Sequence, residues 1–193
     1  LATGASDLIE TRQAVDLILQ HNADLILLQC NTNYTGSLEN FKYVNLNVIK
    51  NFQKTWPGII TGLSDHTPGH AAVLGAISLG GRVIEKHFTD DNTRVGPDHE
   101  FALNPKNWKE MVDRSRELEL ALGDGIKRIE PNEANTSIVQ RRALRLSKNM
   151  KQDQALTQGD LTALRPCPND AINPMFSHEV IGKILKTDKN KGE

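Results

Sequence analysis

Residues 24–30 read DLILLQC, a short and continuous apolar run of the kind that a parallel sheet buries on both faces. Two similar runs follow it, GIITGLS at residues 58–64 and VIEKHF at residues 83–88. The opening residues 1–3 could form the stub of a further strand. These runs predict a parallel sheet whose strands come one after another along the chain.

Helical patterns separate the apolar runs. They cover about residues 7–20, 45–56, 70–79 and 105–122. The last helix is the clearest, because Asn104 can cap it, Pro105 suits its first turn and Gly123 supplies its end. Alternating strands and helices predict an α/β fold with right-handed crossovers. The pattern fits a doubly wound sheet and one half of an eightfold barrel equally well.

The composition changes near residues 123–125. Residues 1–125 carry 11 basic and 16 acidic residues, whereas residues 126–193 carry 12 and 8. We therefore expect a domain boundary there, followed by a polar linker over 126–140 and a small, loop-rich module over 141–193. In that module, residues 143–147 and 161–165 alternate like half-exposed strands, and residues 146–151 weakly resemble residues 185–190.

The whole-chain composition excludes several classes of protein. A net charge of −1 argues against a nucleic-acid binder, and no apolar run approaches the ~18 residues of a membrane span. Two cysteines, Cys30 and Cys167, fit a reducing compartment rather than a disulfide framework. These features predict a soluble, cytoplasmic globular protein without a nucleic-acid or membrane partner.

Polar side chains gather where two of the predicted strands end. Side chains alternate along a strand, so Ser64 shares a face with His66, and Glu85 shares one with His87. On neighbouring strands, both imidazoles would converge at the carboxyl rim and could hold a divalent metal beside Glu85. The plainer interpretation is that each histidine is hydrogen-bonded within a polar layer of the core.

Other candidate contacts lie in loops. Thr32, Asn33 and Tyr34 follow the first strand at the same rim and suit an oxygen-rich substrate, although polar loops are common. Residues 96–99, GPDH, read as an ordinary turn, and Arg165 could reach an anionic substrate. The chain has no Walker-type phosphate loop and no G-x-G-x-x-G, so nucleotide binding has no support.

Together these motifs resemble those of the sialic acid synthase family, the bacterial N-acetylneuraminate and legionaminate synthases. The similarity spans essentially the whole chain, and its motifs are LLQC with Tyr34, GLSDHT at 62–67, IEKHFT at 84–89, GPDH at 96–99, ALGDG at 121–125 and Arg165-Pro166. The resemblance implies a (β/α)₈ TIM barrel followed by an antifreeze-like (SAF) domain, in domain-swapped homodimers. Residues 1–125 would then be the second half of the barrel, and 141–193 an incomplete antifreeze-like domain.

The resemblance also implies an activity and a set of site residues. Phosphoenolpyruvate would condense with an N-acetylmannosamine-type sugar to give a nonulosonic acid and phosphate. His66 and His87 would bind Mn²⁺ or Mg²⁺, with Glu85 orienting a metal-bound water or a sugar hydroxyl. Contacts to phosphoenolpyruvate would come from Ser64, and contacts to the sugar from Tyr34, Asp98 and, across the dimer, Arg165.

The chain departs from the family pattern at two positions. Ala2 stands where the family commonly has serine. Thr32, flanked by Asn31 and Asn33, stands where some members have asparagine, and both departures favour a legionaminate-type substrate.

The family's catalytic glutamate and its phosphoenolpyruvate lysine lie in the first half of the barrel, so we expect this chain alone to be an inactive fragment. A non-catalytic glycan-binding protein and a different metal-dependent barrel aldolase are the alternatives.

Overall fold

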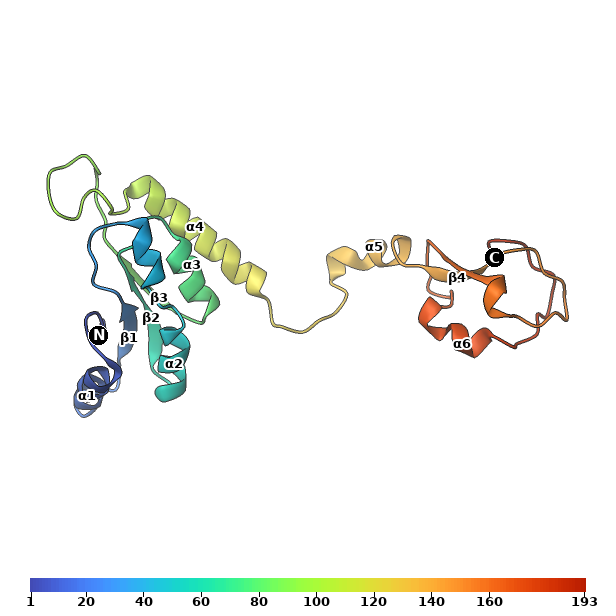
Figure 1. Cartoon of the computed structure of the whole chain (residues 1–193), viewed down its shortest axis with the longest axis horizontal. Coiled ribbons are helices and arrows are strands. Elements are labelled where there is room, and N and C mark those ends of the chain that lie inside the picture. Colours follow the sequence, from blue (N-terminus) through green and yellow to red (C-terminus); the bar gives the residue numbers. More distant parts are fainter. The chain divides into compact units, whose positions relative to one another are not determined.

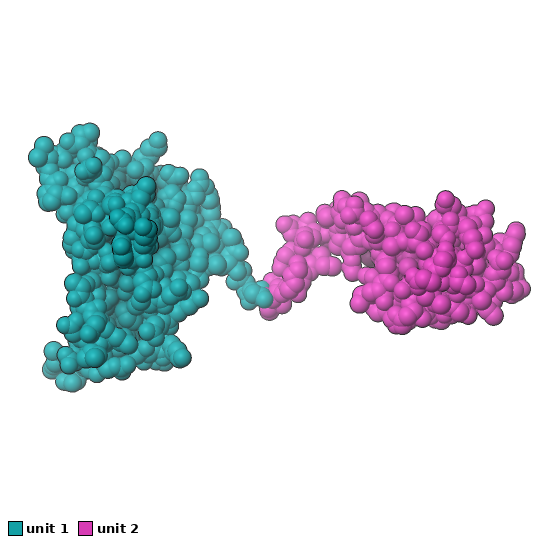
Figure 2. All heavy atoms as spheres, viewed as in Figure 1, with its two compact units in different colours: residues 1–125 teal, residues 126–193 magenta.

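The computed structural model describes residues 1–193 and divides them into two compact units, Leu1–Gly125 and Ile126–Glu193 (Figure 2). Each unit has its own sheet. None of the helices combines the length and the apolar character that crossing a membrane requires.

The first unit contains a three-stranded parallel sheet in the order β1-β2-β3 (Figure 1). Its strands are β1 (Ile26–Cys30), β2 (Ile60–Asp65) and β3 (Val83–Lys86). The opening residues extend this sheet beyond β1 through a parallel bridge between Ala2 and Leu28. The α/β fold with a parallel sheet predicted from the apolar runs is therefore confirmed.

The helices of the first unit follow the expected positions closely. They are α1 (Leu8–Leu19), the 3₁₀ helix η1 (Leu38–Lys42), α2 (Val48–Thr55), α3 (Ala71–Ser78) and α4 (Pro105–Leu122). Asp7 begins α1 with a capping box, because its carboxylate accepts from the backbone of Glu10 and its own N–H donates to the Glu10 side chain. At α4, Asn104 caps the first turn and Gly123 ends the helix with a φ of +58°, as predicted.

The two faces of the sheet differ in what covers them. Leu27 and Leu63 are fully buried and pack into the core with side chains from the helices, which Figure 1 shows beside the strands. Ile26 and Ile60, on the opposite face because side chains alternate, are 38% and 49% exposed. The sheet therefore has one face in an apolar core and one apolar face that is open in part.

Gly62 sets how closely the strands of this sheet approach one another. It pairs with Leu28 on β1 and Val83 on β3. An added Cβ at Gly62 would clash with the Val83 carbonyl oxygen and lie 2.7 Å from the Leu28 Cδ2. The position therefore requires a residue without a side chain.

The second unit is short in regular structure. It contains η2 (Pro131–Glu133), α5 (Ala134–Val139), β4 (Ala143–Leu146), η3 (Gln158–Asp160), β5 (Leu161–Leu164), η4 (Pro174–Phe176) and α6 (Ser177–Val180). Strands β4 and β5 coincide with the two alternating runs expected to be strands, and they pair antiparallel. The two similar segments, 146–151 and 185–190, lie against each other, joined by an antiparallel bridge between Met150 and Lys189.

Residues 126–140, expected to be a polar linker, contain two short helices, η2 and α5. Pro131 occupies the first position of η2, where its missing N–H is no loss, so it begins a helix instead of breaking one. The Ile138 carbonyl, in α5, accepts a hydrogen bond of 2.9 Å from the Cys167 N–H. Part of the expected linker is thus hydrogen-bonded into the second unit.

Asp160 makes the stability of the second unit dependent on pH. Its buried carboxylate accepts from Lys148 Nζ at 2.6 Å and from the Thr157 hydroxyl, and these bonds lower its pKa from 3.8 to about 2. A depressed pKa means that the stabilisation is present at neutral pH and is lost as pH falls from about 4 towards 2. We expect the urea midpoint of residues 126–193, followed by their amide NMR signals, to drop over this range. Asp160→Asn should lower the midpoint at pH 7 and reduce the drop, to which Asp188 and Glu193, whose pKa values hydrogen bonds also lower, contribute as well. An unchanged pH profile in that variant would contradict the assignment.

Candidate functional site

Two histidines meet at the carboxyl end of the sheet. Ser64 pairs with Glu85 and Asp65 with Lys86 in the register of β2 and β3, and the next residues along the two strands are His66 and His87. Their rings lie 5.1 Å apart between centroids. The sequence-based expectation that both imidazoles converge at this rim is met by the geometry.

A backbone carbonyl determines which tautomer the His66 ring adopts. Its Nδ1 lies 2.8 Å from the Asn31 carbonyl oxygen, which can only accept a hydrogen bond. Nδ1 therefore carries the proton, and in the neutral ring the lone pair is on Nε2. This arrangement is the usual preparation of an imidazole for binding a metal through Nε2.

Asp98 and Phe101 flank the other histidine. The Asp98 Oδ2 lies 3.4 Å from His87 Nδ1, and the Phe101 ring lies 5.2 Å from the imidazole. The His87 side chain is 27% exposed and that of Asp98 is 49% exposed. Asp98 is thus beside the histidine pair and open to solvent, where its second oxygen can meet a ligand.

Tyr34 packs against both imidazoles. Its ring centroid is 4.3 Å from that of His66 and 5.7 Å from that of His87. The side chain nonetheless remains exposed. Tyr34 therefore forms a wall of the site whose hydroxyl is available to a ligand.

Ser64 and Glu85 lie on β2 and β3 two residues before His66 and His87, and therefore on the same face of the sheet. The buried Ser64 hydroxyl donates to Glu85 Oε1 over 2.7 Å, which leaves Glu85 Oε2 free of that bond on an exposed side chain. Cys30 pairs with Ser64 in the register, and burial is the main cause that raises the pKa of its thiol. Cys30 is thus protonated at neutral pH, in keeping with a buried small side chain rather than a nucleophile.

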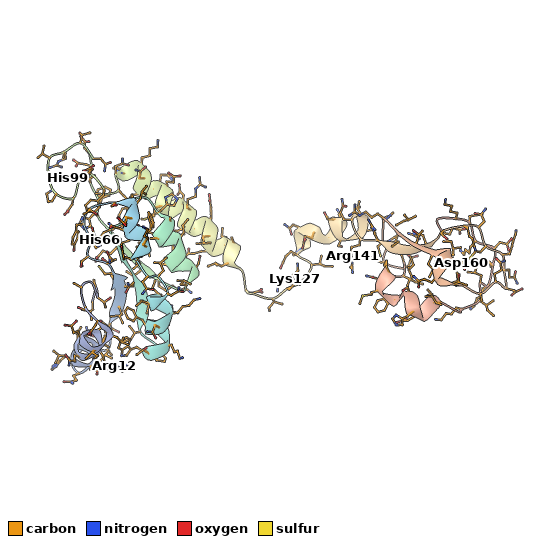
Figure 3. All side chains as sticks on the ribbon, viewed as in Figure 1. Arg12, His66, His99, Lys127, Arg141 and Asp160 are labelled. Atoms are coloured by element: carbon orange, nitrogen blue, oxygen red, sulfur yellow. The ribbon has the colours of Figure 1, made fainter.

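The GPDH motif lies in a loop that side chains hold in place. His99 Nδ1 lies 2.7 Å from the buried Thr89 hydroxyl, and Asn92 Nδ2 donates to the carbonyls of His99 and Ala102 at 2.8 and 2.9 Å. Figure 3 shows His99 in this loop, at the same end of the first unit as His66. Residues 97–100 form a turn, as expected, and these side-chain bonds hold the loop that carries Asp98.

Thr32 and Asn33 lie beside the histidine pair rather than in it. Both are exposed, and the Asn33 side-chain oxygen accepts from the Thr35 N–H and hydroxyl at 3.2 and 2.8 Å. Together with Gln29 and Tyr43 they line an open cavity of about 710 Å³. The side-chain oxygen of Asn33 is therefore engaged within its own loop.

Arg165 belongs to the second unit, where it follows β5. Its Nε donates to the Gln140 carbonyl over 2.7 Å, and the side chain is exposed. The hydrogen bond orients the guanidinium and leaves its two terminal nitrogens available to an acceptor.

Comparison with known proteins identifies the family. Residues 1–127 match the NeuB family. The chain belongs to the NeuB family. It is 33% identical over 196 residues to the N,N'-diacetyllegionaminic acid synthase of Campylobacter jejuni serotype O:2, covering all of this chain and 57% of the relative. It is 34% identical to the pseudaminic acid synthase of Campylobacter jejuni serotype O:23/36, covering 90% of this chain and 49% of that protein.

A solved structure agrees with this membership. The N-acetylneuraminic acid synthetase of Leptospira borgpetersenii serovar Hardjo-bovis, crystallised with citrate, superposes with a TM-score of 0.62 at 28% identity. The match covers 70% of this chain and 46% of that one. The chain spans about half the length of the curated relatives it matches. The three relatives named here are synthases of three different acids, N,N'-diacetyllegionaminic, pseudaminic and N-acetylneuraminic acid.

The donor set of this NeuB chain fits a divalent cation in part. His66 and His87 supply two imidazoles within reach of each other, and the His66 tautomer leaves Nε2 as the donor. The structure has no group of three or more histidine, cysteine or acidic side chains that could hold a metal. Two protein ligands would leave the remaining coordination positions to water or other ligands.

Sequence reasoning missed three residues around this site. Phe101 was not singled out, and its contact with His87 gives no signal in the sequence because it depends on the path of the loop. Asp65 and Lys86 were read only as parts of motifs. Their signal was available, since side-chain alternation places both on the face opposite the histidines.

Proposed function

We propose that the protein to which this chain belongs is a nonulosonic acid synthase that condenses phosphoenolpyruvate with an N-acylated mannosamine-type sugar and releases phosphate. The histidine pair carries the proposal, because His66 is held in the tautomer that a metal ligand needs and His87 lies 5.1 Å away at an open rim. Membership of the NeuB family and the names of the relatives support the same reaction class.

The proposed architecture is the second half of a (β/α)₈ barrel over residues 1–125, followed by an incomplete antifreeze-like domain over 141–193. The open face of the sheet supports it, because Ile26 and Ile60 are exposed where a closed barrel would bury them. We propose that the complete protein is a domain-swapped homodimer in which Arg165 of one protomer reaches the sugar site of its partner.

His66 and His87 would hold Mn²⁺ or Mg²⁺, and the two imidazoles favour Mn²⁺ because Mg²⁺ prefers oxygen ligands. Such an ion, when bound, polarises the aldehyde oxygen of the open-chain sugar. Asn31 and Asp98 contribute by holding the two rings, the first through its carbonyl at 2.8 Å and the second from 3.4 Å.

Each remaining residue has a role that follows from its position. Ser64 keeps the Glu85 carboxylate oriented at 2.7 Å, so that Glu85 can accept a proton from a water or sugar hydroxyl. Tyr34 covers the imidazoles and presents its hydroxyl to the sugar. We assign Asp98 to a sugar hydroxyl, and Thr32 and Asn33 to weaker contacts at the rim.

A phosphate-release assay tests the proposal. The chain, extended to the length of its relatives, is supplied with phosphoenolpyruvate, Mn²⁺ and either N-acetylmannosamine or its 2,4-diacetamido-6-deoxy analogue. We expect release with the diacetamido sugar, as for a legionaminate-type synthase, and none from the 193-residue chain alone. No release with either sugar from a folded protein that binds Mn²⁺ would contradict the reaction and favour a glycan-binding protein or another metal-dependent aldolase.

A further inference from the structure

A buried ion pair lies directly behind the histidines. Lys86 Nζ is 2.7 Å from Asp65 Oδ2, and the two side chains are 2% and 1% exposed. The same ammonium group donates to the Thr67 carbonyl over 2.6 Å. The other carboxylate oxygen of Asp65 accepts from the Thr67 N–H at 2.9 Å and from its hydroxyl at 2.8 Å.

The pair joins the two strand ends that carry the site. Asp65 and Lys86 are partners in the register of β2 and β3. Asp65 stands between Ser64 and His66, and Lys86 between Glu85 and His87. Side-chain alternation turns both towards the helix-covered face, where Leu63 and Ile84, two positions earlier on each strand, pack in the core.

Such a buried ion pair is expected to contribute little to the free energy of unfolding. Removing two charges from water costs free energy that their attraction only partly returns, and well-packed apolar replacements often leave a protein at least as stable. A buried pair with every polar atom satisfied does, however, hold a single geometry. Here that geometry includes the backbone of residues 65–67 and of Lys86, and therefore the starting points of both imidazoles.

We propose that the Lys86–Asp65 pair, locked by Thr67, is a positioning element that sets the distance between His66 and His87 for binding a divalent cation. The proposal rests on the proposed function, because it takes the two histidines as ligands of the same ion. Neither Lys86 nor Asp65 touches the ion or the substrate. Their effect passes through the backbone to the rings.

The test replaces both charges together. Asp65→Leu/Lys86→Met removes the pair without leaving an unpaired buried charge, so the fold is expected to persist. The unfolding midpoint should fall, because the buried Thr67 loses its bonds to both side chains. Mn²⁺ affinity of the full 193-residue chain is measured by electron paramagnetic resonance, and folding by circular dichroism. We expect Kd for Mn²⁺ to rise about 10- to 100-fold, the usual effect of losing a residue that orients a metal ligand.

Two further variants complete the test. Thr67→Val keeps the ion pair, the side-chain volume and the backbone N–H bond to Asp65, and removes only the hydroxyl bond to that oxygen. We expect a smaller rise in Kd. Lys109→Met is the matched control, because it removes a Lys–Asp bond of 2.6 Å on the surface of the same unit and should leave Kd unchanged.

The outcomes separate this proposal from the function on which it rests. A folded double variant with the wild-type Kd would overturn it, since a purely structural pair affects the unfolding midpoint but not the affinity of the folded chain. If the double variant does not fold, an unchanged Kd in Thr67→Val would overturn it instead. If His87→Ala binds Mn²⁺ with the same Kd as the wild-type chain, the metal site itself is refuted.

Discussion

Replacing His87 with alanine is expected to abolish specific Mn²⁺ binding and to lower synthase turnover about 10³-fold in the extended chain. The reason is that the site offers two imidazoles, so one loss leaves a single ligand. Lewis-acid polarisation is worth several kcal/mol, of which ~4 corresponds to that factor. The measurements are a Mn²⁺ titration and the phosphate-release assay. His66→Ala should behave in the same way.

The two histidine variants differ in their risk of misfolding. The His87 side chain is 27% exposed and should be removable without loss of structure, whereas His66 is buried and hydrogen-bonded to Asn31. His21→Ala, an exposed histidine in the same unit, is the control and should retain full affinity and activity. Unchanged turnover in folded His87→Ala would remove the metal from the proposed mechanism.

Gly62→Ala should destabilise the first unit by about 3 kcal/mol or more, a large share of the ~5–15 kcal/mol that holds a domain together. An added Cβ would meet the Val83 carbonyl oxygen, which is part of the paired backbone of β3 and cannot turn aside. The measurement is a urea titration followed by tryptophan fluorescence, because Trp56 and Trp108 both lie in the first unit.

Gly75→Ala provides the matched comparison. The new Cβ in α3 would also meet a neighbour, but that neighbour is the terminal methyl of Leu46, which can rotate. Alanine also favours a helix over glycine by about 1 kcal/mol, so the net change should stay within ~1 kcal/mol of zero. Similar losses in the two variants would show that strand spacing does not decide the effect at Gly62.

The elements of the first unit could be predicted because their signals are local. An apolar run of strand length can be recognised without knowing its partner strand. The start of α4 is signalled by Asn104 and Pro105, and its end by Gly123. The second unit was harder to interpret, since its turns depend on hydrogen bonds between distant segments. The bond from Cys167 to Ile138 is one that no local pattern could predict.

The candidate site was predictable to the level of faces and edges. A period of two places Ser64 with His66 and Glu85 with His87 on single faces, and parallel strands bring their carboxyl ends together. The role of Asn31 was not predictable, because it contributes a carbonyl, which every residue has. The position of Asp98 beside His87 was also hidden, because it depends on the bonds from Thr89 and Asn92 that shape its loop.

Local sequence patterns alone predicted the alternation of strands and helices, the boundary near residue 125 and the two histidines as candidate metal ligands. These follow from side-chain chemistry and from periodicities that act over a few residues. Three properties could be known only from the folded chain: the 5.1 Å between the imidazole centroids, the tautomer of His66 and the ion pair behind the rings. Those properties depend on strand register and on backbone groups from distant segments, which packing alone brings within hydrogen-bond distance.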